Sequence, residues 1–441
     1  MVKELEEKLD SFDSSVRQSA LRKLCGLVEA GAVDLPSASR KVNLHCHTFY
    51  SYNSYGYSPA KIAWLSRRRG LAAAAVIDFD ALDGLEEFLT AGSVLNLKCC
   101  GGFETRVFFP EFADKQINSP GEPGIAYHIG AAIPRGNLDA KLGRFLQKMK
   151  ATAQNRNIAL MNKVNEYLKP VELDYEKDVT VLTPNGNATE RHLCLAYARK
   201  AQQLFPDSDD LSNFWSDKLQ IDAKELDLPE GVDLLMALRA KTMKQGASGY
   251  VKAIGSEFLK MKDVNDFILA AGGIPTAAWL DGTTEAERDL SGLLEREMAQ
   301  GIAAINIIPD RNYTSGVSDD RLDNLVKAVS LAQELHLPVA VGTEMNSFGQ
   351  KFVDDFDSHE LKPMVDIFLK GAYIFYAHSV LERNCCLGYT SQWAKRKFSG
   401  RAEKNCFYQE VGFLLSPAKE DLIKGLGENV TTTEILKKLK G

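Results

Sequence analysis

The stretch Lys41-Val42-Asn43-Leu44-His45-Cys46-His47-Thr48 contains the pattern that says most about this chain. A short β-prone run ends in two imidazoles separated by one residue, and alternate residues of a strand point to the same side. Both rings can therefore reach one point beyond the carboxyl end of the strand, where barrel enzymes place their chemistry. Neutral imidazole is a common ligand for zinc, iron, nickel and copper. The pair indicates a metal site, with two ordinary histidines at a strand end as the alternative.

Outward from this stretch, short apolar runs alternate with amphipathic helical patterns. We expect strands at 41–45, 73–78, 98–104, 125–133, 273–280, 302–308, 338–343 and 372–377. We expect helices between several of them, at 58–69, 83–95, 285–300, 320–335 and 358–369. Strands that alternate with helices indicate an α/β fold with a mainly parallel sheet, open or closed into a barrel.

Two regions outside this alternation are predicted to be helical. Residues 1–35 form a lead-in, because leucine and valine recur there at roughly helical spacing among charges. Between about 136 and 260 the strands give way to helical patterns at 137–168, 188–204, 208–220, 232–245 and 255–270. We therefore divide the chain into an N-terminal helical extension (1–40), a first barrel part (41–160), a helical insertion (161–250), and a second barrel part with C-terminal helices (251–441).

Composition places the chain in a broad class. Its 441 residues are 45% apolar and 25% charged, as in ordinary globular proteins, and a net charge of −6 argues against general nucleic-acid binding. Eight cysteines without a Cys-x-x-Cys pair indicate a reducing compartment. We find neither a signal-peptide core nor an apolar stretch approaching the roughly 20 residues that span a membrane. We expect a cytoplasmic protein without a membrane partner, and oligomerisation stays open.

Polar residues follow several of the predicted strands. Asp78 and Asp80 follow the run that ends at Ile77, Glu104 follows Phe103, and Glu344 follows Thr343; His128 lies within its strand. Parallel strands bring their carboxyl ends together. Convergence of these imidazoles and carboxylates would create a mixed nitrogen and oxygen site for a divalent metal.

In the motifs at these strand ends, the sequence resembles the PHP (polymerase and histidinol phosphatase) superfamily. His45-x-His47, Val76-Ile77-Asp78-Phe79-Asp80 and Gly101-Gly102-Phe103-Glu104 follow its motifs in order and spacing. Glu190-Arg191-His192 is similar to its Arg-Pro-His element, Gly272-Gly273-Ile274-Pro275 to the strand before Ala-His-Pro, and Val341-Gly342-Thr343-Glu344-Met345-Asn346 to Gly-Ser-Asp-x-His. The resemblance covers most of 41–350 and implies a distorted (βα)7 barrel with metals at its carboxyl rim.

The departures from the family pattern are equally informative. Phe79, Asn53 and Asn346 stand where the family usually has ligands, and the Ala-His-Pro histidine is replaced around Trp279. What remains is His45, His47, Glu104 and Glu344, which in the family largely build one metal site, with His128 as the candidate remnant of a second. We expect zinc, manganese or iron, as one or two ions.

The remaining site residues are assigned by position. Asp78 is expected to orient a ligand or act as a base, and Arg191 to stabilise phosphate charge near a helix start, unless Arg191 is an ordinary surface residue. Further substrate contacts are expected from Asn53, Arg106, His192, Asp281, Asn346 and His378.

These observations favour a metal-dependent hydrolase, namely a phosphoesterase acting on a small phosphorylated metabolite or nucleotide. Two alternatives stay open. A barrel that has lost about half of the usual ligands could serve in binding or regulation. A single metal with carboxylates also suits a lyase, an isomerase or a hydrolase of other bonds, because fold does not fix function.

Overall fold

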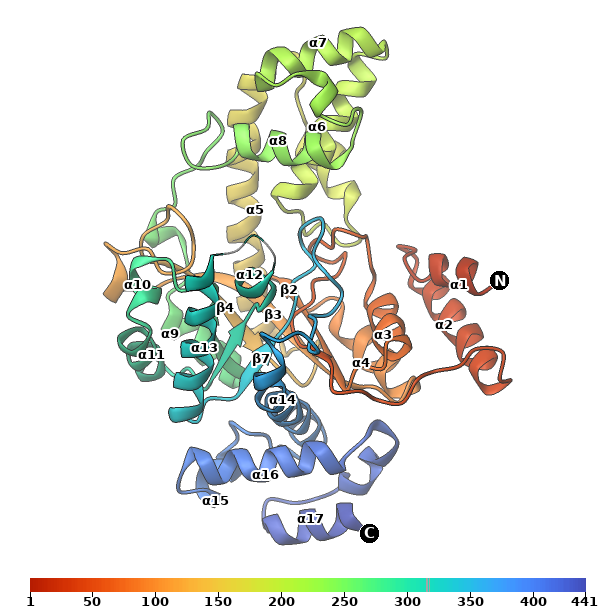
Figure 1. The fold of residues 1–441 in the computed structure, drawn as a ribbon, viewed down its shortest axis with the longest axis vertical. Helices are drawn as coiled ribbons and strands as arrows, with labels where there is room; N and C mark the ends of the chain where they lie inside the picture. Colours follow the sequence, from red (N-terminus) through yellow and green to blue (C-terminus); the bar gives the residue numbers. More distant parts are fainter. Residues whose placement is uncertain (315, 317) are drawn as a thin grey trace.

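The computed structural model describes residues 1–314, 316 and 318–441, and its centre is a seven-stranded sheet in the order β1 to β7 (Figure 1). The strands are β1 (Val42–Asn43), β2 (Ala73–Phe79), β3 (Lys98–Phe108), β4 (Ile125–Ala131), β5 (Ile274–Trp279), β6 (Ala304–Ile307) and β7 (Val339–Val341). The amide of Leu44 donates to the carbonyl of Val341 (2.7 Å), so the first strand also meets the last. The sheet is thereby a nearly closed barrel, which confirms the predicted α/β class.

The direction of one strand distorts the barrel. β1, β2 and β3 pair in parallel, and so do β5, β6 and β7, whereas β4 is antiparallel to both of its neighbours. The chain therefore leaves β4 at the barrel end opposite to the carboxyl ends of the parallel strands. Helix α5 (Ala140–Leu168), about 43 Å long at 1.5 Å per residue, carries it back past the barrel (Figure 1).

Helices pack around the barrel, most of them where the sequence predicts a helix. They are α3 (Pro59–Arg68), α4 (Leu85–Val94), α9 (Met261–Ala270), α10 (Glu285–Arg288), α11 (Leu290–Ala299), α12 (Asp310–Tyr313) and α13 (Asp319–Glu334). The start of α3 shows the local reason: Ser58 caps it by accepting from the amide of Lys61 (3.0 Å), and Pro59 occupies the first turn. The predicted helices 58–69, 83–95 and 320–335 are confirmed, and 285–300 is divided into α10 and α11.

The predicted strand 372–377 is wrong, because these residues lie inside helix α14 (Val365–Cys385), and the predicted helix 358–369 is correspondingly misplaced. α14 is buried nearly all round, between the barrel and α16 (Arg401–Leu414), so its apolar run has no polar face to reveal a helix. The segment Lys362–Cys385 is long and apolar enough to span a membrane, contrary to the sequence expectation. In the structure 78% of its most apolar window is buried within the protein, as in a core helix.

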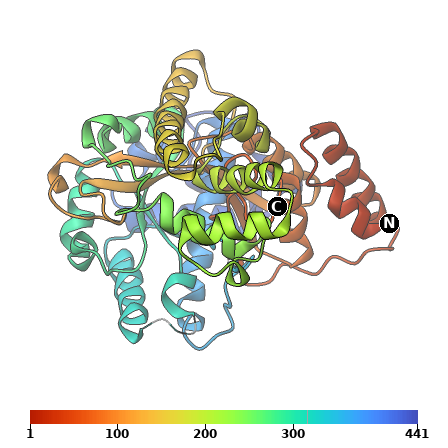
Figure 2. The ribbon, with the colours of Figure 1, turned by 90° about the horizontal axis from the view of Figure 1, so that it is seen from above.

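The helices inserted between β4 and β5 have their own hydrophobic core. They are the far half of α5, α6 (Glu190–Leu204), α7 (Ser208–Leu219) and α8 (Val232–Thr242), and Tyr197 and Trp215 are fully buried among them. Figures 1 and 2 show this group above one end of the barrel. Below we call it the roof.

Helices flank the barrel at both ends of the chain. α1 (Val2–Lys8) and α2 (Ser14–Glu29) confirm the helical lead-in, and α15 (Gln392–Lys397) and α17 (Thr432–Lys440) join α16 at the other end. Arg17 of α2 is buried and ion-paired with Glu87 of α4, and its guanidinium also donates to the hydroxyl of Tyr50 (3.3 Å). The N-terminal helices thus hold the loop that follows His47.

Candidate active site

Three predicted ligands meet just after β1 and within β3, where Glu104 pairs in register with Phe79 at the carboxyl end of β2. One ligand atom each from His45, His47 and Glu104 lies within 4.8 Å of the others, and all three side chains are buried. The Glu104 Oε2 atom is 3.5 Å from the Nε2 of His45 and 3.3 Å from that of His47. None of these three atoms has a hydrogen-bond partner among the described residues. Buried polar atoms without partners are costly, so this donor set, below called the triad, fits a divalent cation.

Each imidazole of the triad is held through its other nitrogen. The Nδ1 of His45 donates to the amide oxygen of Asn306 on β6 (3.0 Å), and the Nδ1 of His47 lies 3.2 Å from the hydroxyl of Ser51. A proton on Nδ1 leaves the lone pair of Nε2 facing the centre of the triad. Burial opposes ionisation of Glu104, but His45 and His47 lower the pKa of this carboxyl to about 2. Its carboxylate in turn raises the pKa of His45 against the effect of burial.

Asp78 organises the loop after His47. Its carboxylate accepts from the Thr48 amide (2.7 Å), the Thr48 hydroxyl (2.7 Å) and the Ser51 hydroxyl (2.6 Å). Ser51 thereby presents an oxygen lone pair to His47. Burial raises the pKa of Asp78, which lies 2% exposed beneath the loop. Of the two expected roles, this geometry corresponds to orienting a ligand.

Glu344 lies beside the triad, and its carboxylate has other partners. Its backbone completes the barrel closure, since the His47 amide donates to the Glu344 carbonyl (2.8 Å). Its carboxylate accepts from the Nη2 of Arg311 (3.1 Å) and the side-chain amide of Gln350 (3.1 Å). Burial opposes ionisation, but the Arg311 guanidinium lowers the pKa of Glu344. The lowered pKa favours the ionised carboxylate. Its oxygens do not belong to the group of ligand atoms that lie within 4.8 Å of one another.

Two predicted histidines lie elsewhere. Tyr127 lines the cavity described below, so strand alternation turns His128 outward, where its Nε2 lies 2.7 Å from the amide oxygen of Asn265 on α9. His378 is in α14 rather than at a strand end, and its Nε2 donates to the carbonyl of Gly272 (2.8 Å). Burial lowers the pKa of each imidazole to about 4. The structure brings neither residue to the triad.

Three predicted substrate contacts have structural partners instead. Asn53 donates to the carbonyl of His47 (2.8 Å), and His192 accepts from the Thr189 amide (3.1 Å) to cap α6. Asp281 pairs with Arg321 (3.4 Å). None of Asn53, His192 and Asp281 lines the cavity, whereas the predicted residues Arg106, Arg191 and Asn346 do.

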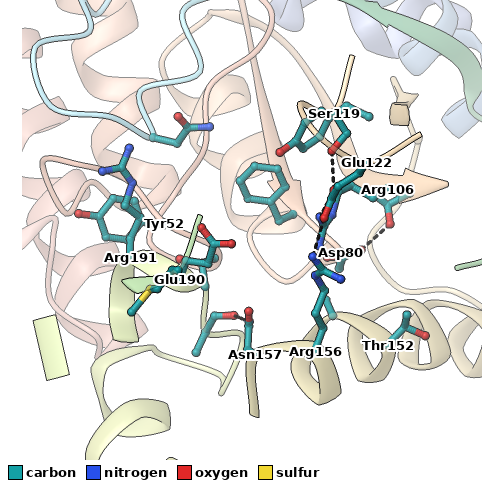
Figure 3. A pocket seen from close by; sticks show the side chains of 18 of the residues that line it. Tyr52, Asp80, Arg106, Ser119, Glu122, Thr152, Arg156, Asn157, Glu190 and Arg191 are labelled. Atoms are coloured by element: carbon teal, nitrogen blue, oxygen red, sulfur yellow. Dashed lines mark hydrogen bonds and ion pairs between the residues drawn. The ribbon is translucent and has the colours of Figure 1, made fainter. Parts of the chain in front are cut away.

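A cavity of about 410 Å³ separates the barrel rim from the roof (Figure 3). Its charged lining residues are Arg106, Arg156, Arg191, Arg239, Lys244 and Arg311 against Asp80, Glu122, Glu190 and Glu344. Burial raises the pKa of Asp80 to about 6, so this carboxyl loses its charge only in mildly acidic solution. The cavity thus carries an excess of positive charge.

Four of these six cations form two pairs, and each pair shares one carboxylate. Glu122 pairs with Arg106 (2.8 Å) and Arg156 (2.5 Å), as the dashed lines in Figure 3 show. Glu190 pairs in the same way with Arg239 (2.9 Å) and Lys244 (2.6 Å).

Arg191 differs from these cations. Its Nη2 donates to the hydroxyl of Ser347 (2.6 Å), and it has no carboxylate partner among the described residues. Arg191 is thereby available to an anionic ligand.

Phe79 stands between the triad and this cavity. Its ring stacks on His47 with centroids 4.2 Å apart, and it lines the cavity together with Glu344. The amide of Asn187, at the base of the roof, donates to the carbonyl of Phe79 (2.7 Å). A change at this aromatic side chain would therefore alter access from the cavity to His47.

Sequence reasoning missed Arg311 and Asn306. Arg311 follows the predicted strand 302–308, so the rule that strand ends carry functional groups could have found it. Asn306 lies within that strand among apolar neighbours, and only its contact with His45 marks it.

Comparison with known proteins yields structural likeness alone. No family model and no curated protein matches the chain. It is similar to an amidohydrolase from Chromobacterium violaceum solved with sulfate and no metal, at 17% identity and a TM-score of 0.48, over 70% of this chain and 88% of that one. It is also similar to a protein from Bifidobacterium adolescentis assigned as a metal-dependent phosphoesterase, at 13% identity and a TM-score of 0.48, over 76% and 98%.

Proposed function

We propose that this protein is a metal-dependent hydrolase of the PHP type, a phosphoesterase acting on a small phosphorylated molecule. The observation that carries the proposal is the triad, with three buried and unpartnered ligand atoms, beside a cavity with excess positive charge.

The triad would hold the divalent ion, with Glu344 adjacent. Such an ion supplies Lewis acidity toward a phosphoryl oxygen and lowers the pKa of a water molecule. Asn306 and Ser51 keep His45 and His47 in the orientation that this requires.

The cavity residues would supply the rest of phosphate recognition. Arg191 has no competing carboxylate in the part of the chain that the structure describes, and it can donate to phosphoryl oxygens, as can the unshared donors of Arg106. About 410 Å³ is the size of a small-molecule pocket, which favours a metabolite or mononucleotide over a polymer.

A binding role is the second candidate, and one observation favours it. Phe79 covers His47, and none of the triad residues lines the cavity. In this case the cavity would hold a phosphorylated ligand without cleaving it, and the triad ion would stabilise the barrel.

Metal content and turnover distinguish the two. Protein purified without chelator is analysed by elemental mass spectrometry, beside the His45→Ala/His47→Ala variant and His359→Ala, whose residue is exposed in a turn. Each is then assayed with p-nitrophenyl phosphate and a series of nucleoside monophosphates.

The hydrolase proposal expects about one equivalent of zinc, manganese or iron in the wild type and His359→Ala proteins. It also expects that the double variant loses both metal and turnover. Metal without turnover on any phosphoester would favour the binding role. Absence of metal after incubation with all three ions would refute the metal site itself.

A further inference from the structure

We propose that Arg311 exchanges partners: it holds the Glu344 carboxylate in the free protein and binds the anionic group of the substrate when this enters. The exchange releases Glu344 toward the triad. This inference rests on the proposed function, because it concerns the same cavity and the same metal site.

Arg311 is placed to make this exchange. It lies on α12, directly after β6, and its guanidinium forms part of the cavity wall. Its Nη2 is 3.1 Å and 3.5 Å from the two oxygens of Glu344, and its buried Nε has no acceptor among the described residues. A guanidinium has five N–H donors, so Arg311 retains donors for an anion. Its side chain is 40% exposed, which leaves it accessible from the cavity.

Glu344 is placed to respond. Its amide donates to the carbonyl of His45 (2.8 Å), so its backbone is one hydrogen bond away from a triad residue. The side chain is 6% exposed, and its charge acts on both triad imidazoles and on Glu104. Among the described residues, Arg311 and Gln350 are the side chains that hold its carboxylate.

The relative strength of the partners gives the exchange its direction. A phosphate dianion presents more charge and more acceptor oxygens to a guanidinium than one carboxylate does. A buried carboxylate that loses its cation is costly, so Glu344 would turn to the positive charge of an ion at the triad. Substrate binding and metal binding therefore strengthen each other, and such coupling is reciprocal.

Cobalt binding measured by visible absorption and by calorimetry tests the exchange without relying on turnover. The proteins are the wild type, Arg311→Gln, Glu344→Gln and the double variant. Arg191→Gln is the matched control, because it removes a cavity guanidinium that does not contact Glu344. Each titration is repeated with saturating inorganic phosphate.

The exchange predicts that Arg311→Gln tightens Co²⁺ binding about 10-fold, within the usual range of coupling between sites. Arg191→Gln should tighten it much less, by the loss of positive charge alone. In the Glu344→Gln background the effect of Arg311→Gln should vanish. Phosphate should tighten Co²⁺ binding in the wild type and lose most of this effect in Arg311→Gln. Arg311→Lys, which keeps the charge but not the forked donors, should be intermediate and serves if the glutamine variant does not fold.

Equal effects of Arg311→Gln and Arg191→Gln, or an unchanged effect of Arg311→Gln in the Glu344→Gln background, would overturn the exchange. Phosphate coupling of equal size in every variant would also overturn it, because it would show direct contact between phosphate and metal. These results leave the proposed function standing if Co²⁺ binds the wild type and is lost in His45→Ala/His47→Ala. No binding to the wild type would refute both proposals.

Discussion

Asn306 offers a direct test of how the triad is organised. Its amide oxygen accepts from the Nδ1 of His45 at 3.0 Å, and both residues are at most 2% exposed. We predict that Asn306→Leu, which keeps most of the volume but removes the acceptor, weakens metal binding. Asn306→Asp keeps an acceptor and adds charge, so it should bind metal at least as tightly as the wild type.

The magnitude follows from the buried position of this bond. Loss of the acceptor leaves a buried N–H unsatisfied, at about 1–3 kcal/mol, and allows the proton to move to Nε2, where it blocks the ligand lone pair. Since 1.4 kcal/mol is a factor of ten, we expect metal affinity to fall about 10- to 100-fold, as for other residues that orient metal-bound histidines.

The assay is competition for metal with a chromogenic chelator at pH 7. The matched control is Asn265→Leu, which removes the corresponding bond from His128 (2.7 Å) and leaves another buried imidazole without its acceptor. This control should lower stability without changing metal affinity. If Asn306→Leu binds metal within 2-fold of the wild type, or if Asn265→Leu loses as much affinity, the reasoning about the triad is refuted.

Three further predictions concern stability and ligand binding. Arg17→Met should lower the free energy of unfolding by about 3–5 kcal/mol in urea, because it leaves Glu87 without its buried partner; a loss under about 1 kcal/mol would contradict this. Glu297 is buried, which raises its pKa from 4.5 to about 8, so its contribution to stability is fully present below pH 4.5 and is lost as pH rises through 8. Glu297→Gln should therefore be more stable than the wild type by roughly 4 kcal/mol at pH 9 and nearly equal to it at pH 4.5, and an equal difference at both pH values would count against this burial. Arg191→Gln should weaken competitive inhibition by inorganic phosphate about 10-fold or more, since charge-assisted hydrogen bonds contribute about 1.5–3 kcal/mol; an unchanged inhibition constant would show that Arg191 is a surface residue.

The barrel strands could be predicted because their signal is local. Strands buried on both faces appear as short apolar runs, and those at 73–78, 98–104 and 125–133 correspond to β2, β3 and β4. The same signal produced the error at 372–377, because a helix buried all round is apolar in every register. The direction of β4 has no local signal, since it depends on which neighbours the strand pairs with.

Some residues of the candidate site could likewise be predicted from the sequence, and others could not. His45, His47 and Glu104 could be predicted because each lies at the end of an expected strand, although β3 continues past Glu104 to Phe108. The outward turn of His128 could not, because β4 is buried on both faces and alternation alone does not tell which face lies inside. The contact of Arg311 with Glu344 joins residues 33 apart in the chain, across two strands of the barrel.

The reversed direction of β4 places the roof as one insertion between β4 and β5, apart from the strands that carry the candidate ligands. The triad precedes the long excursion through α5 and the roof, and Glu344 follows it, so neither depends on the roof for its place in the strand order. The roof contributes Glu190, Arg191, Arg239 and Lys244 to the cavity. Descendants of this protein could therefore exchange or lengthen the roof and acquire new ligands while the barrel keeps the triad. A chimera with another roof grafted after α5 would be the natural starting point for redirecting it.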